Sequence, residues 1–210
     1  MPKVKDVVIL ADGDFPSHKI PLDILSSAGF IISCDGAAGK LIETGIIPDM
    51  IAGDMDSLAP ALQERFASII YRSDCQETND LTKAFMLALE LNPETISILG
   101  ATGLREDHTL GNISLLCDYS SMTPIPVTMW TNYGKFIFIS GGGVFKAPAG
   151  SQVSLFALED GIRMNSRGLK YQLQNVIFDN WWKATLNESV GDQFELIFEK
   201  GRVILFIGYL

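Results

Sequence analysis

Two carboxylates one residue apart, Asp54 and Asp56, lie in the pentapeptide GDMDS at residues 53–57, directly after a short apolar run. Carboxylate oxygens on a tight turn suit one or two hard divalent cations such as Mg²⁺. A calcium loop of the EF-hand type fits poorly, because the twelfth position from Asp54 is Arg65 instead of the required glutamate. A solvated turn that caps a helix would explain the same residues. The position after a predicted strand favours a metal site.

A run of small residues follows the second predicted strand. Residues 35–39 read DGAAG, which places Asp35 and Gly36 at the start of a predicted helix. Small residues let a backbone approach a phosphate or ribose closely, and a helix N-terminus favours anions. A plain strand-to-helix turn is the alternative. The motifs GxGxxG and GxxxxGK[ST] occur nowhere in the chain, so a dinucleotide fingerprint and a Walker phosphate loop are both absent.

Two later segments offer charged groups at the start of predicted helices. Residues 100–108, GATGLREDH, supply backbone N–H groups together with Arg105 and Asp107, which suits phosphates and a metal. Asp80 and Lys83 lie three residues apart on one face of another predicted helix, from which Lys83 could reach a phosphate. Helix capping by Asp107 and the favourable charge of Asp80 near a helix N-terminus would explain both acids without a function.

The first part of the chain alternates short apolar runs with helix-like stretches. We expect strands at residues 7–10, 30–33, 50–52, 69–71, 95–99 and 127–130, and helices at 20–27, 35–41, 60–66, 79–91 and 107–119. This alternation predicts βαβ units and a mostly parallel sheet. Ligands of such sheets bind beyond the carboxyl ends of the strands. Asp35, Asp54, Asp74 and the segment 100–107 follow successive strands, so we expect them to gather on one rim.

The pattern changes after about residue 131. Short β-type runs separated by Gly, Asn and Pro are expected to form strands at residues 136–139, 144–146, 151–157, 168–173, 194–198 and 203–207. This arrangement predicts a small antiparallel sandwich or barrel. We place the domain boundary within residues 124–133 and take the two domains as residues 1–128 and 129–210.

Composition excludes several classes of function. The net charge of −9 over 210 residues argues against a nucleic-acid or anionic-membrane partner, which would need clustered Lys and Arg. No apolar run is long enough to span a bilayer, and we see no signal peptide. The three cysteines form no CxxC pair, which indicates reduced thiols and a cytoplasmic protein. Neither of the two histidines belongs to a recognisable triad, so we assign no catalytic histidine.

Six segments in the same order resemble motifs of the thiamine pyrophosphokinase family. The family motifs DGGAN, GDxDS, TDxxK, GATGGRxDHxLxN, GLKY or GLKW, and TSNE are similar in turn to residues 35–38, 53–57, 79–83, 100–112, 168–171 and 185–188. The resemblance covers nearly the whole chain. The chain departs from it at Asn79 in place of Thr, at Glu106 where an apolar residue is common, at Leu186 in place of Ser, and at Gly39, where the asparagine of DGGAN is lost.

The resemblance implies a fold of the α/β class, with an N-terminal Rossmann-like, mostly parallel nucleotide-binding domain followed by a small antiparallel β-sandwich that binds thiamine. It implies Mg²⁺-dependent transfer of pyrophosphate from ATP to the hydroxyl of thiamine, which gives thiamine diphosphate and AMP. It also implies a homodimer in which thiamine lies where the α/β domain of one subunit meets the β domain of the other.

By the same resemblance we assign roles to individual residues. The metal ligands are expected to be Asp54, Asp56 and Asp80, and Asp107 is a fourth catalytic acid. Contacts with ATP are expected from Asp35, Gly36, Lys83, Gly100, Thr102, Gly103, Arg105 and Asn112. Contacts with thiamine are expected from Tyr171, Thr185 and Asn187.

Two alternative functions stay open at this point. A metal-dependent phosphohydrolase or a sugar-nucleotide transferase also uses a DxD turn at a strand end, although the GLKY-like and TSNE-like segments speak against both. A thiamine- or nucleotide-binding module without catalysis is the other alternative. It would not need four or five acids that converge on one rim.

Overall fold

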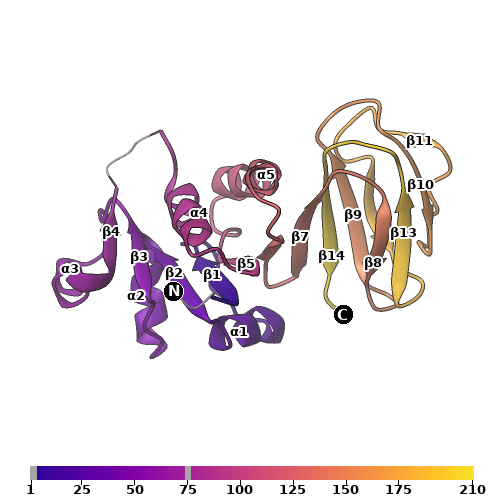
Figure 1. Ribbon diagram of the computed structural model, residues 1–210. Helices are drawn as coiled ribbons and strands as arrows, with labels where there is room; N and C mark the ends of the chain where they lie inside the picture. Colours follow the sequence, from indigo (N-terminus) through magenta and orange to yellow (C-terminus); the bar gives the residue numbers. More distant parts are fainter. Residues whose placement is uncertain (1–3, 74–76) are drawn as a thin grey trace. The chain divides into compact units, whose positions relative to one another are not determined.

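The computed structural model describes residues 4–73 and 77–210, and Asp74 and Cys75 lie outside this range. The chain divides into two compact units, Met1–Asn132 and Tyr133–Leu210. In Figure 1 the colours follow the residue number, so each unit can be identified by its colour. The division falls four residues after the predicted domain end at residue 128, because strand β6 (Val127–Trp130) pairs along its length with β5 (Thr95–Leu99) and belongs to the first unit.

The first unit is built on a parallel sheet whose described strands run in the order β6-β5-β1-β2-β3-β4. The remaining strands are β1 (Asp6–Leu10), β2 (Phe30–Cys34), β3 (Met50–Gly53) and β4 (Ile70–Arg72). The helices are α1 (Lys19–Ser26), α2 (Asp35–Glu43), α3 (Pro60–Arg65), α4 (Asp80–Glu90) and α5 (Glu106–Met122), with a 3₁₀ turn, η1 (Ala67–Ile69). The predicted βαβ alternation is confirmed.

The strand order reverses between β1 and β5. From β1 the chain adds β2, β3 and β4 on one side, whereas β5 and β6 lie on the other side. Connections leave these two neighbouring strands in opposite directions, so a crevice opens beyond their carboxyl ends. Strand β1 itself is central and apolar, and its residues from Val7 to Leu10 are buried, as expected for a strand covered on both faces.

Helix α4 shows why the chain folds locally as the periodicity predicts. Its cap, Asn79, accepts a hydrogen bond at Oδ1 from the backbone N–H of Thr82 (2.9 Å), which satisfies one of the free donors of the first turn. Its apolar stripe is buried, and Phe85 stacks on Tyr119 of α5 with 3.9 Å between the ring centroids. No helix in the described part of the chain is long and apolar enough to cross a membrane.

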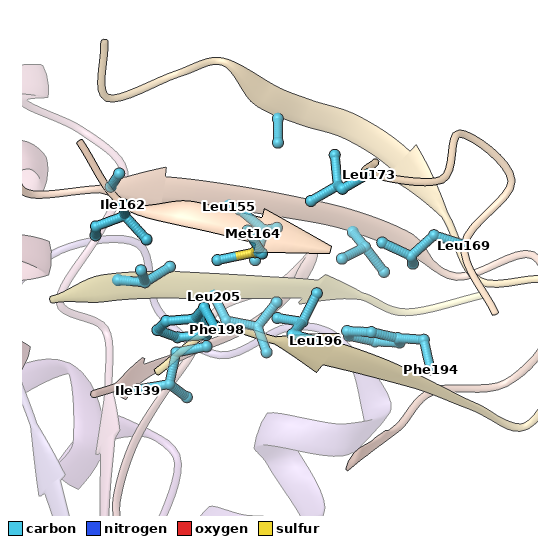
Figure 2. Packing of buried hydrophobic residues seen from close by; sticks show 14 of the residues in the cluster. Ile139, Leu155, Ile162, Met164, Leu169, Leu173, Phe194, Leu196, Phe198 and Leu205 are labelled. Atoms are coloured by element: carbon cyan, nitrogen blue, oxygen red, sulfur yellow. The ribbon is translucent and has the colours of Figure 1, made fainter. Parts of the chain in front are cut away.

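The second unit is a sandwich of two antiparallel sheets, with strand orders β12-β9-β14-β7 and β11-β10-β13-β8. Their bounds are β7 (Gly134–Ile139), β8 (Gly143–Lys146), β9 (Gln152–Ala157), β10 (Arg163–Arg167), β11 (Val176–Ile177), β12 (Ala184–Glu188), β13 (Gln193–Ile197) and β14 (Val203–Gly208). Both sheets contribute to one core (Figure 2), in which Leu155 and Leu205 of the first sheet meet Met164, Phe194 and Leu196 of the second.

One predicted strand of this unit is wrong. Residues 168–173 form no strand; the strand is β10, and Gly168 turns the chain at its end with φ of +77°. A Cβ at this glycine would lie 2.9 Å from the carbonyl oxygen of Gln193, so the turn requires glycine. Strand β10 was missed because it lacks an apolar run: only Met164 and Ser166 are buried, between exposed polar residues.

Candidate active site

A cavity of about 430 Å³ opens beyond the carboxyl ends of β1, β2 and β5, at the point where the strand order reverses. It is lined by residues of five segments, namely Ala11, Asp12, Gly13; Cys34, Asp35, Gly36; Ser57; Asn79, Asp80, Leu81; and Ala101, Gly103, Leu104, Arg105, His108, Asn112. Four of these segments lie at the ends of parallel strands, and the fifth includes the first turn of α4. Of the strand-end residues predicted to gather on one rim, Asp35 and residues of the segment 100–107 line this cavity.

Three aspartates form a cluster at this rim. Asp35, Asp54 and Asp56 each offer a carboxylate oxygen, and these oxygens lie within 4.8 Å of one another. The turn that presents two of them is held by Met55, whose side chain is buried with Leu58 and whose φ of +71° is left-handed. Burial of the middle residue leaves Asp54 half-buried and Asp56 exposed beside Asp35.

Asp35 is the buried member of the cluster. Asp35 is the first residue of α2, and its Oδ2 accepts a hydrogen bond from the backbone N–H of Ser57 (3.4 Å). Within the described residues, Oδ1 is buried and has no hydrogen-bond partner. Burial raises the pKa of Asp35, the N–H of Ser57 lowers it, and the charges of Asp80 and Asp56 raise it again. A divalent cation bound to the cluster would supply the missing partner and the missing positive charge.

Asp80 lies close to this cluster but is paired differently. Its Oδ1 accepts a hydrogen bond from Nζ of Lys83 (3.0 Å), whose side chain is 7% exposed. The three-residue spacing on α4 therefore makes an ion pair, as the helix geometry allows. The predicted metal ligands were Asp54, Asp56 and Asp80, whereas the three acids that cluster in the structure are Asp35, Asp54 and Asp56. The role of Asp80 as a metal ligand stays a prediction.

The glycine loop, residues 100–105, follows β5 and forms one wall of the cavity. Gly100, Gly103 and Leu104 all have positive φ, at +63°, +78° and +62°. Asn112 of α5 holds the loop from within, because its Nδ2 donates to the carbonyl of Ala101 (2.8 Å). Gly103 and Arg105 line the cavity, whereas Gly100 and Thr102 are not among its lining residues. The loop thus offers a glycine-rich backbone at the rim, next to one guanidinium.

Arg105 and Asp107 pair with each other on the surface. The Arg105 Nη2 lies 2.5 Å from the Asp107 Oδ2, and Nε lies 3.1 Å from Oδ1. This bidentate contact lowers the pKa of Asp107 to about 2. Asp107 also accepts a hydrogen bond from the N–H of His108 (3.0 Å). Its carboxylate is outside the three-acid cluster, so its catalytic role stays a prediction.

Asp12 is a cavity residue that the sequence analysis missed. It follows β1 as Asp35 follows β2, and its Oδ1 accepts a hydrogen bond from Nζ of Lys40 (2.8 Å). A Cβ at Gly36 would lie 2.4 Å from Oδ2 of Asp12, so glycine at position 36 makes room for this carboxylate. The rule of strand ends applies to Asp12 as well, because it follows the predicted strand at residues 7–10.

The predicted substrate residues of the second unit lie on and beside β12. Tyr171 is exposed, Thr185 is half-buried and Asn187 is buried. The Asn187 side chain is engaged by its own chain: Oδ1 accepts from the N–H groups of Tyr171 (3.0 Å) and Glu188 (2.9 Å), and Nδ2 donates to the carbonyl of Tyr171 (2.7 Å). Asn187 therefore positions the segment that presents the Tyr171 ring.

Replacing Asn187 with alanine is expected to lower the free energy of unfolding by ~2 kcal/mol, because three partly buried hydrogen bonds to the backbone are lost. Denaturant titration of the variant measures this change. Gln174→Ala is the matched control: it removes an exposed amide of the same unit, so it is expected to change stability little. Equal stability of Asn187→Ala and the original chain would contradict the positioning role.

The fold and the site together define a class: a parallel α/β unit with an acidic cavity at its strand ends, followed by an antiparallel sandwich. Comparison with known proteins places the chain within this class. Residues 22–129 match the family model "Thiamin pyrophosphokinase, catalytic domain", and residues 134–206 match "Thiamin pyrophosphokinase, substrate-binding domain". The chain belongs to the thiamine pyrophosphokinase family, as the sequence motifs indicated.

Individual relatives agree with this assignment. Thiamine pyrophosphokinase of Bacillus subtilis is 40% identical over 90 residues, which are 40% of this chain and 42% of that protein. Thiamin pyrophosphokinase 1 of Caenorhabditis elegans is 25% identical over 180 residues, 75% of this chain and 70% of that protein. The crystal structure of the Bacillus subtilis protein matches with a TM-score of 0.82 at 24% identity, over 97% of this chain and 99% of that one, which shows a shared fold.

Proposed function

We propose that this protein is a thiamine diphosphokinase, which transfers a pyrophosphoryl group from ATP to the hydroxyl of thiamine with Mg²⁺ as cofactor. The observation that carries the proposal is the cluster of Asp35, Asp54 and Asp56 at the rim of the strand-end cavity, with one buried carboxylate oxygen that lacks a partner. Membership in the family supports the substrates, and the position of the cavity at the reversal of strand order supports a nucleotide ligand.

In this reaction the hydroxyl oxygen of thiamine forms a bond to the β-phosphorus of ATP. The bond between that phosphorus and the oxygen bridging it to the α-phosphorus breaks, and AMP leaves. Such transfers depend mainly on positioning and on neutralising charge. When bound, Mg²⁺ neutralises and orients phosphate oxygens. The residues that would hold it are Asp35, Asp54 and Asp56, with Asp80 beside them.

The remaining residues of the rim bind phosphates and move one proton. The glycine loop presents its backbone to the phosphates, and Arg105 adds a positive charge at the same wall. Lys83 holds the carboxylate of Asp80 in place. One carboxylate of the rim, Asp54 or Asp80, accepts the proton that the thiamine hydroxyl loses. The predicted phosphate contacts of Gly36, Gly100, Thr102 and Asn112 belong to the same proposal.

The second unit is the proposed site of thiamine binding. The match of residues 134–206 to a substrate-binding domain supports this role. Tyr171 offers an exposed aromatic face, which suits the cationic ring of thiamine. Thr185 and Asn187 complete the residues expected near the substrate. A homodimer with thiamine bound where two subunits meet, and a cytoplasmic location, are carried over from the family resemblance as part of the same proposal.

A coupled assay tests the reaction. Purified protein with ATP, Mg²⁺ and thiamine is expected to release AMP and form thiamine diphosphate, and chelation of the metal with EDTA is expected to abolish both. Release of ADP would contradict pyrophosphoryl transfer. Release of phosphate without thiamine would instead identify a phosphohydrolase. Tight thiamine binding in a calorimeter with no AMP would identify a binding module.

A further inference from the structure

The side chain of Asn132, the last residue of the first unit, holds the loop that follows β1. Its Oδ1 accepts hydrogen bonds from the backbone N–H groups of Ser17 (2.7 Å) and His18 (3.1 Å). Its Nδ2 donates to the carboxylate of Asp14 (2.9 Å) and to the carbonyl of Phe15 (3.0 Å). One amide thus makes four hydrogen bonds to a five-residue segment more than a hundred positions away in the sequence.

The segment held by Asn132 continues directly into contacts with the glycine loop. The backbone N–H of Gly13 donates to the carbonyl of Gly100 (2.6 Å), and that of Asp14 donates to the carbonyl of Thr102 (2.8 Å). The two backbones touch, because a Cβ at Gly13 would lie 2.4 Å from both carbonyl oxygens. Both loops lie outside helices and strands, so hydrogen bonds of this kind determine their shape.

These two loops form adjoining parts of the cavity lining. Ala11, Asp12 and Gly13 line the cavity from the loop after β1, and Ala101, Gly103, Leu104 and Arg105 line it from the glycine loop. Asp14 is outside this lining, and its carboxylate accepts the hydrogen bond from Asn132. The four hydrogen bonds of Asn132 therefore fix the position of the loop after β1, although Asn132 itself does not line the cavity.

We propose that Asn132 is a positioning residue of the nucleotide site: it fixes the loop after β1, and this loop fixes the glycine loop in the shape that receives the triphosphate. The inference rests on the proposed function for the identity of the ligand. When the two loops are ordered before binding, the binding of ATP does not have to supply the entropic cost of ordering them. Loss of the Asn132 side chain is therefore expected to act mainly on nucleotide affinity. The position needs a side chain with two donor hydrogens and an acceptor oxygen on one amide.

Asn132→Ala tests this role. We expect the KM for ATP to rise about tenfold, while kcat changes by less than about twofold and the KM for thiamine is unchanged. Backbone amide hydrogen exchange, measured without nucleotide, is expected to be about tenfold faster at Gly13 and Asp14. These two amides donate to the glycine loop and not to Asn132, so their exchange reports the transmission from one loop to the other.

A charge variant and its rescue sharpen the test. Asn132→Asp removes both donor bonds and places a carboxylate against that of Asp14, so its KM for ATP is expected to exceed that of Asn132→Ala. Adding Asp14→Asn to the same chain removes the repulsion and restores a donor, and is expected to recover most of the difference. A merely structural role would not produce this reversal in KM.

Thr95→Val is the matched control in the same unit. It removes the 2.7 Å hydrogen bond from the Thr95 hydroxyl to Asp6, which lies at the N-terminal ends of β5 and β1, away from the cavity. The variant is therefore expected to have a modestly lower Tm, whereas the KM for ATP and the amide exchange of Gly13 and Asp14 are expected to be unchanged. Unchanged exchange and KM in Asn132→Ala would overturn the inference.

Calorimetry with a non-hydrolysable ATP analogue separates the inference from the proposed function. If the unmodified chain binds the analogue and Asn132→Ala binds it equally well, the positioning role is wrong and the proposed function stands. If the unmodified chain binds no analogue, the proposed function fails and the inference fails with it.

Discussion

Replacing Asp56 with alanine is expected to reduce AMP formation from ATP and thiamine at least about a hundredfold while the protein stays folded. Asp56 lies within 4.8 Å of Asp35 and Asp54, counted between carboxylate oxygens, and a metal bridging phosphates loses a charged ligand when this group is removed. The side chain is exposed, and its described hydrogen bond comes from the neighbouring Ser57 hydroxyl (2.7 Å). Little stability therefore depends on it.

Steady-state kinetics over a range of Mg²⁺ concentrations measures the effect. The Asp56→Ala variant is expected to need more Mg²⁺ for half-maximal rate, because the loss of a metal ligand weakens Mg²⁺ binding. An unchanged Mg²⁺ requirement would contradict the metal role. Asp23→Ala is the matched control, because Asp23 is also an exposed aspartate of the first unit, paired on the surface with Lys19. Loss of such an exposed pair changes stability little, and the control is expected to retain full activity.

The strand-end acids could be predicted because a parallel sheet converts sequence order into spatial proximity. Asp35 and Asp54 each follow a strand of the predicted alternation, and β2 pairs with β3 in the structure. Proximity on a rim, however, does not specify the partner of each side chain. Whether Asp80 faces the cluster or Lys83 depends on helix rotation and rotamers, which residue types and spacing leave open.

Side-chain partners also explain what the sequence analysis missed. Asn187 belongs to a family motif, which suggested a substrate contact, but the motif did not reveal that its side chain also bonds to the backbone of Tyr171 and Glu188. Asn132 belongs to no motif and lies far from Asp14 in the sequence, so only the folded chain reveals its hydrogen bonds. Strand β10 escaped because its exposed polar residues pair through the backbone, which hydrophobic periodicity does not detect.

Replacing Asp35 with asparagine is expected to stabilise the metal-free protein and to abolish its response to Mg²⁺. Asp35 is 1% exposed, its Oδ1 has no partner among the described residues, and burial is the largest cause of its raised pKa. Without a cation, a buried carboxylate beside two other acids opposes folding. An asparagine keeps the acceptor for the N–H of Ser57 and offers an amide donor to Asp54 and Asp56, and it carries no charge.

Thermal unfolding with EDTA and with Mg²⁺ measures both effects. In EDTA the Tm of Asp35→Asn is expected to rise by about 2 to 4 °C, which corresponds to ~1 kcal/mol for a chain of this length. Mg²⁺ stabilises any folded state that binds it, so it is expected to raise the Tm of the original chain and not that of the variant. AMP formation by the variant is expected to fall at least about tenfold.

Asp49→Asn is the matched control for this substitution. The exposed Asp49 accepts a hydrogen bond from the backbone N–H of Ile31 (2.8 Å) immediately before β3, at the end of the sheet opposite the cavity. It is expected to show no rise of Tm in EDTA and to keep its response to Mg²⁺. A lower Tm of Asp35→Asn in EDTA together with a preserved Mg²⁺ response would show that Asp35 stabilises the fold instead of binding metal. A higher Tm of Asp35→Asn in EDTA together with a lost Mg²⁺ response would show that the buried charge of Asp35 destabilises the metal-free protein and is needed to bind the cation.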